Sequence, residues 1–105
     1  MKSTSTERII AIHDAQKEFF RSGATIDIKF RKEMLVKLLD AMNRWEKELT
    51  DALWTDLHKS YEEAYLTEIS IVKGEIKTHL RKLAGWARRR KAHSPIKLFP
   101  SRSYI

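Results

Sequence analysis

Cysteine is absent from this sequence of 105 residues, which excludes disulfides, thiolate metal sites and a cysteine nucleophile for these residues. Glycine and proline are scarce, at three and two residues, while charged residues make up 33% of the chain. This composition favours helices over sheets and argues against wholesale disorder. No apolar run approaches the ~18 residues of a membrane span, and the polar start leads into a charged segment rather than a signal core. We therefore expect one compact cytoplasmic unit.

Acidic residues are scarce in the last third of the chain. Residues 73–105 hold ten of the 21 basic residues but one of the 14 acidic ones. Such a block is found in proteins that bind nucleic acid or anionic lipid, and it is equally typical of a solvated helix end. Its members with helical spacing are Lys73, Lys77, Arg81 and Arg88, which continue into Arg89, Arg90 and Lys91.

The longest helical pattern covers residues 60–91. Ser60 and Glu63 have the spacing of a capping box, which predicts the start of the helix. The cationic residues 88–91 and Pro95 beyond them indicate its end. Apolar residues recur there every three or four positions and predict one apolar side of the helix: they are Tyr65, Ile69, Val72, Ile76, Leu80, Leu83 and either Trp86 or Ala87.

Mostly small residues gather on the opposite side of this predicted helix, together with one isoleucine. Two of the small residues are glycines, which lower the stability of a helix relative to alanine. The pattern leaves two interpretations open, a second contact surface or a solvated polar face. The residues are Thr67, Ser70, Ile71, Gly74, Thr78 and Gly85.

The first part of the chain predicts another helix. Thr4 and Glu7 form a possible capping box, and the helix runs to about Ser22, after which Gly23 supplies a left-handed residue. Its apolar face is expected to contain Ile9, Ile12, Ala15 and Phe19.

A second helix is predicted from the N-cap Asp27 onward. Asn43 and Arg44 mark either a bend or a break, because Asn is a poor helix former and the acidic residues 46–51 suit a new first turn. Its apolar stripe comprises Phe30, Met34, Leu38, Met42, Trp45, Leu49, Leu53 and Leu57.

The link at residues 58–60 is short, so the second and third helices are expected to form a long antiparallel hairpin with the first helix across it. Pro95 and Pro100 forbid a helix farther on, and residues 101–105 are typical of the start of a strand. We therefore predict an all-α fold with three helices, a helical segment at residues 1–93, and an extended tail at 94–105.

No catalytic, cofactor-binding or metal-binding residue is predicted. Glu75 and His79 have the i, i+4 spacing of helix ligands, but a surface pair explains them more simply. The carboxylates Glu62 and Glu63 suit a helix start. The sequence contains neither a glycine-rich phosphate loop nor a nucleophile with a base at recognisable spacing. The tryptophans, which fit core or interface packing better than a cofactor box, are Trp45, Trp54 and Trp86.

Several segments in order resemble one enzyme family. They are residues 20–25, Phe30 and Arg31, Leu35, Leu38 and Leu39, residues 52–60 and 63–69, Leu83, Trp86, Pro95 and residues 101–105. Together they are similar to the amino-terminal part of the NAD(P)-dependent aldehyde dehydrogenase superfamily. His58 stands where many branches have glycine, which favours the class 3 or fatty-aldehyde branch.

The resemblance implies a fragment of an α/β enzyme that oxidises aldehydes with NAD or NADP. In that family a cysteine forms a thiohemiacetal, hydride passes to the nicotinamide, and a glutamate promotes hydrolysis of the thioester. None of these catalytic residues aligns with this chain, so its role would be structural. Its partner would be the rest of such a chain, and the isolated fragment is expected to self-associate, without a membrane span.

The alternative from the residues alone is a self-contained basic helical module that binds nucleic acid or an acidic partner. The aromatic residues do not alternate with the basic ones as base stacking would require, and no short recognition helix follows a turn. We therefore expect no nucleic-acid partner.

Overall fold

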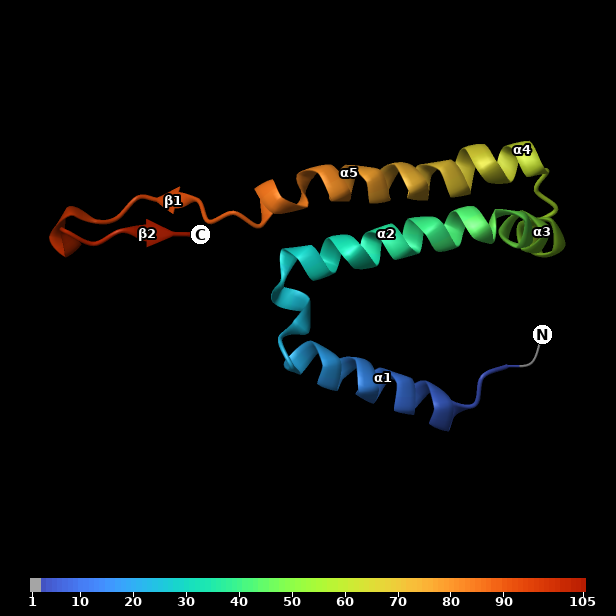
Figure 1. Cartoon of the computed structure of the whole chain (residues 1–105), viewed down its shortest axis with the longest axis horizontal. Helices are drawn as coiled ribbons and strands as arrows, with labels where there is room; N and C mark the ends of the chain where they lie inside the picture. The colour runs from blue at the N-terminus through green and yellow to red at the C-terminus, as the bar shows by residue number, and fades with distance from the viewer. Residues whose placement is uncertain (1–2) are drawn as a thin grey trace.

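The structure is a computed structural model that describes residues 3–105. The molecule is elongated, with extents of 64 × 36 × 22 Å, and Figure 1 shows its helices arranged as an open frame rather than a closed bundle. Two long helices, α2 (Ile28–Arg44) and α5 (Ser70–Trp86), lie side by side and antiparallel. This confirms the predicted all-α fold and its helical hairpin.

Helix α1 (Thr6–Arg21) begins with Ser5 as its N-cap, whose hydroxyl accepts a hydrogen bond from the Arg8 amide at 3.3 Å. The prediction that Thr4 caps the start of this helix was therefore wrong by one residue. Gly23 follows the helix with φ 79°, the left-handed conformation expected of it. It leads into the short helix η1 (Ala24–Ile26), against which α1 packs. The prediction that α1 lies across the hairpin was wrong, because the chain folds back at η1 and α1 runs below α2 (Figure 1), with the centre of the Phe19 ring 5.7 Å from that of the Phe30 ring at the start of α2.

Helix α2 is capped by Asp27, whose carboxylate accepts a hydrogen bond from the Lys29 amide at 3.0 Å, as predicted. The chain then breaks at Trp45, which has φ −102° and ψ 18°, and helix α3 (Glu46–Leu57) follows in a new direction. The open choice between a bend and a break is thus settled as a break. The acidic first turn of α3 favours this new helix start.

The third helical segment consists of α4 (Tyr61–Ala64), the π-helix η2 (Tyr65–Ile69) and α5. Ser60 caps it by accepting a hydrogen bond from the Glu63 amide at 3.2 Å, as predicted. Its predicted end at Lys91 was wrong, since α5 ends at Trp86. Arg90 exchanges backbone hydrogen bonds with Ile105 instead, at 2.9 and 2.8 Å, so the chain leaves the helix for a sheet.

The tail forms a hairpin of two short antiparallel strands, β1 (Lys91–Ala92) and β2 (Ser103–Tyr104), with the helix η3 (Ile96–Leu98) between them. Lys91 pairs with Tyr104 and Ala92 with Ser103. The predicted strand near the end of the chain is confirmed, but it begins at Ser103. The division into 1–93 and 94–105 stays a prediction.

Few side chains are buried in the described residues. The buried apolar residues there are Ala64, Ile69 and Ile76, joined by the polar Thr50. The radius of gyration is 20.4 Å, whereas a compact domain of this length has about 13 Å. The helices therefore present much of their apolar surface to the outside.

Candidate functional site

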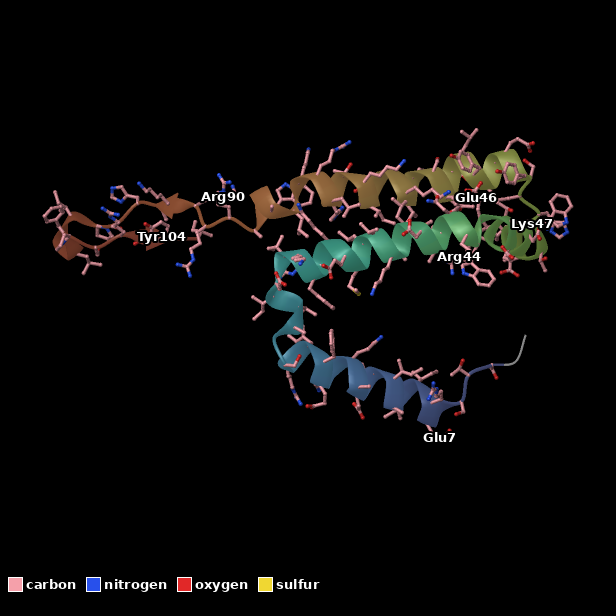
Figure 2. The ribbon with its side chains drawn as sticks, in the orientation of Figure 1. Glu7, Arg44, Glu46, Lys47, Arg90 and Tyr104 are labelled. Atoms are coloured by element: carbon pink, nitrogen blue, oxygen red, sulfur yellow. The ribbon has the colours of Figure 1, made fainter. Side chains whose placement is uncertain are left out.

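Glu46, at the start of α3, joins the broken second helix to the third helical segment. Its carboxylate accepts a hydrogen bond from the Tyr61 hydroxyl at 2.8 Å and another from the Lys73 ammonium. The Lys73 nitrogen also lies 5.8 Å from the centre of the Tyr65 ring. Figure 2 shows Glu46 between the end of α2 and the α4–α5 segment. We call Glu46, Tyr61 and Lys73 the Glu46 cluster.

Hydrogen bonds within the Glu46 cluster shift the pKa values of Glu46 and Tyr61. The hydrogen bond from Lys73, followed by that from Tyr61, holds the pKa of Glu46 below its ordinary value. The same carboxylate raises the pKa of Tyr61, because it favours the neutral hydroxyl as a donor. A carboxylate whose pKa is lowered is poorly suited to act as a general base near neutral pH. The cluster is therefore a structural connection between helices.

A second ion pair closes the turn of the helical hairpin. The Lys59 ammonium lies 2.5 Å from a Glu68 carboxylate oxygen and 3.4 Å from the Thr67 hydroxyl. The Lys59 side chain is 22% exposed. This pair holds the connection between α3 and α4 against the π-helix.

An apolar groove of about 290 Å³, which we call the α3 groove, lies between α3 and the start of α5. Its walls consist of aliphatic side chains, and two carboxylates, Asp56 and Glu68, border it. The apolar residues that line it are Met42, Leu49, Ala52, Leu53, Ile69 and Val72.

One side of helix α1, which we call the α1 face, is an open and largely apolar surface formed by α1 alone. Ile12 is 42% exposed and Phe19 is 49% exposed there, and both were predicted to lie on the apolar face of this helix. Its residues are Arg8, Ala11, Ile12, Ala15, Gln16 and Phe19. The α3 groove and the α1 face are therefore two apolar surfaces of this open frame.

The predicted basic flank is not continuous. Lys73 is paired with Glu46 and its side chain is 11% exposed, while Arg88 lies beyond the end of α5. Arg81 donates a hydrogen bond to the Thr78 hydroxyl on its own helix at 3.3 Å. The structure therefore does not assemble these residues into one stripe along a helix.

The spacing of Glu75 and His79 produces a surface pair. The His79 Nδ1 atom lies 2.9 Å from the Glu75 carbonyl oxygen and 3.9 Å from its carboxylate. In residues 3–105 no group of three potential ligands is assembled for a metal ion. Glu62 and Glu63 occupy the first turn of α4, as their helix-start interpretation predicts. The predictions that catalytic, cofactor-binding and metal-binding residues are absent remain predictions.

The predicted face of small residues meets open space. A side chain added at Gly74 or Gly85 would meet no atom within 4 Å, and Ile71 is 57% exposed. The tryptophans are exposed as well, at 54%, 56% and 49% for Trp45, Trp54 and Trp86. Trp54 and Trp86 contact the rings of His58 and His79, with ring centres 5.5 and 5.1 Å apart, and otherwise remain about half exposed.

Sequence reasoning missed the Glu46 cluster, because Glu46 and Lys73 are 27 positions apart and no spacing rule joins them. One signal was available. Lys73 lies four residues after Ile69 and three before Ile76, so it borders the buried stripe of its helix. A lysine at that position needs an acidic partner on the facing helix.

Among the described residues, no helix has the length and apolar content needed to cross a membrane.

No protein-family model matches the sequence. The chain is 44% identical over 89 residues to a 4,4'-diaponeurosporen-aldehyde dehydrogenase of Staphylococcus aureus, which covers 85% of this chain and 19% of that protein. It is also 37% identical over 81 residues to a dimeric, NADP-preferring aldehyde dehydrogenase of the dog, which covers 77% of this chain and 17% of that protein.

A solved structure is similar as well, the substrate-bound state of Staphylococcus aureus AldH. It matches with a TM-score of 0.86 and 41% identity over 92% of this chain and 21% of that one. The chain thus spans about a fifth of the length of the relatives it matches. The alternative of a self-contained basic module gains no support from these comparisons.

Proposed function

The chain corresponds to an amino-terminal segment of the aldehyde dehydrogenase superfamily, and on this premise we propose that it is helical scaffold for an enzyme that oxidises aldehydes to carboxylic acids. The observation that carries the proposal is the agreement with a solved aldehyde dehydrogenase in both sequence and fold over 92% of the chain. The catalytic cysteine and the general base would lie elsewhere in the enzyme, because this sequence has no cysteine.

The open frame supports a scaffold role. Helices that expose apolar side chains along their length gain stability when another part of a protein covers them. The α3 groove and the α1 face are surfaces of that kind, and the radius of gyration of 20.4 Å leaves them uncovered by this chain. In the whole enzyme, the remaining part of the chain would pack against these helices.

The cofactor of the whole enzyme would be NAD or NADP, bound outside these residues, and it would accept hydride from the substrate. The described residues would contribute helix packing through the Glu46 cluster and the Lys59–Glu68 pair. We propose a cytoplasmic location for the enzyme, in line with the polar, charged composition of the chain.

The isolated chain is proposed to self-associate, since its exposed apolar surfaces have no other partner in pure solution. Sedimentation velocity over a range of concentrations would show an average mass above that of a 12.4 kDa monomer. A monomer at every concentration, with no binding of a dye that detects apolar surface, would contradict this.

The scaffold proposal is tested by assaying the pure 105-residue chain with aldehydes and with NAD or NADP. We expect no reduction of the nicotinamide, while an intact Staphylococcus aureus relative assayed in parallel reduces it. Turnover that copurifies with the isolated chain would overturn the assignment of the chemistry to other residues.

A further inference from the structure

We propose that the tail hairpin, residues 88–105, docks on the surface of an anionic lipid bilayer, with its turn inserted among the lipids and its cations at the headgroups. The scaffold role does not involve this hairpin, since the α3 groove and the α1 face contain none of its residues. Docking of this kind needs no helix that crosses the membrane.

The tail hairpin projects beyond the end of α5 and holds its own shape. Figure 1 shows it at one end of the long axis of the molecule, with the turn that contains η3 farthest from the helices. Across the hairpin, the Ser94 hydroxyl donates a hydrogen bond to the Ser103 hydroxyl oxygen at 2.8 Å. Within the turn, the Ser101 amide donates to the Leu98 carbonyl at 2.7 Å. The turn is therefore an ordered tip.

The tip of the hairpin is apolar and exposed. Ile96 is 88% exposed and Phe99 is 86% exposed, and Leu98 lies between them with 60% of its surface exposed. These three side chains belong to four consecutive residues at the turn. Apolar side chains that gather on a projecting turn gain free energy when they leave water together.

Exposed cations flank this apolar tip. Residues 76–105 contain no Asp or Glu, and within the part of the chain that the structure describes none of these cations forms an ion pair. An apolar tip with unpaired cations beside it matches the order of layers in an anionic membrane, whose apolar interior is covered by negative headgroups. The cations are Arg88, Arg89, Arg90, Lys91, Lys97 and Arg102.

The composition of the tip favours lipid over nucleic acid as the partner of these cations. Phosphates attract cations and bases stack on aromatic rings, but the aliphatic side chains of Ile96 and Leu98 have no counterpart of either kind in a nucleic acid. In a bilayer they meet acyl chains. Lys97 lies between them, and its alkyl stem lets the ammonium reach the headgroups while the stem stays in the apolar layer.

The natural absence of cysteine lets a single label report on the tip. A dye whose emission shifts to shorter wavelength in an apolar environment is attached to the full chain through Ile96→Cys in η3. The matched control carries the dye through Ile26→Cys, since Ile26 is another exposed isoleucine in a short helix, η1. Each labelled chain is mixed with vesicles of phosphatidylcholine and phosphatidylglycerol, or of phosphatidylcholine alone. We expect a blue shift for the Ile96→Cys label on the anionic vesicles, and little shift in the other three mixtures.

Cosedimentation of the cysteine-free chain with the same anionic vesicles measures how much the tip contributes to binding. Phe99→Ser should bind several-fold more weakly than the parent chain. Phe20→Ser, which removes an exposed ring from α1, should bind as the parent does. Equal shifts from the two labels, or equal binding by the two serine variants, would refute insertion of the tip. Binding to duplex DNA without a shift on vesicles would refute it as well and assign the cations to nucleic acid.

Discussion

Glu46 and Lys73 pair across 27 positions of sequence and connect the start of α3 to α5. Lys73 is nearly buried, at 11% exposure, and Glu46 is partly buried, at 24%. Tyr61 donates a second hydrogen bond to the same carboxylate. In a frame with few buried side chains, this contact fixes where the broken second helix meets the third helical segment.

Replacement of Glu46 by Gln should lower stability in a pH-dependent way. The folded-state pKa of Glu46 is lowered, so its contribution is present above the unfolded pKa of about 4.3 and is lost as pH falls through the folded value. The difference between the parent chain and Glu46→Gln in urea unfolding should therefore shrink as pH falls from about 7 to about 3.

Glu48→Gln is the matched control for that measurement, because Glu48 lies in the same first turn of α3. Glu46→Gln should change the pH dependence of stability more than Glu48→Gln does. A difference between the parent and Glu46→Gln that stays constant over the whole pH range would contradict the role assigned to the pair. Protein concentration must be held fixed throughout, since self-association shifts apparent stability.

Ile76→Ala should destabilise the hairpin by about 2–5 kcal/mol, because it removes one of the few buried aliphatic side chains. Ile71→Ala on the same helix is the control, since Ile71 is 57% exposed, and a change there should stay within about 0.5 kcal/mol. Thermal or urea unfolding followed by circular dichroism measures both. Equal effects of the two substitutions would mean that α5 packs by another face.

Replacement of Gly74 and of Gly23 by alanine should change the stability of the chain in opposite directions. Gly74 lies inside α5 with nothing within 4 Å of an added side chain, so Gly74→Ala should stabilise by about 0.5–1 kcal/mol. Gly23 has φ 79°, so Gly23→Ala should destabilise the connection after α1. Unfolding curves of the two variants check this, and a stabilising Gly23→Ala would show that the turn is not left-handed.

Local rules predicted the helices and most of their starts. Asp27 and Ser60 cap the helices that their side chains suggested, and Gly23 adopts the left-handed conformation. These features depend on a few neighbouring residues, so sequence reasoning reaches them. The choice of Thr4 over Ser5 failed because two hydroxyl residues compete for the same cap and spacing alone ranks them poorly.

Long-range contacts were beyond local rules. The end of α5 at Trp86 depends on Arg90 bonding to Ile105, which is distant in sequence. The pairing of Lys73 with Glu46 depends in turn on how two helices cross. The α1 face was predicted to be apolar from its helical period, and its residues Ile12 and Phe19 remain about half exposed here. The spacing of apolar residues shows which face of a helix is apolar, but it does not show which other part of the protein covers that face.

The most direct test of the scaffold account places this segment in an intact relative, in exchange for the relative's own segment. In the Staphylococcus aureus enzyme, the matching amino-terminal segment is replaced by the residues of this chain or deleted, and NAD(P)-dependent aldehyde oxidation is measured. The account predicts that the exchanged enzyme retains activity and that the deleted one loses it. A folded but inactive exchanged enzyme, or full activity without the segment, would contradict the account.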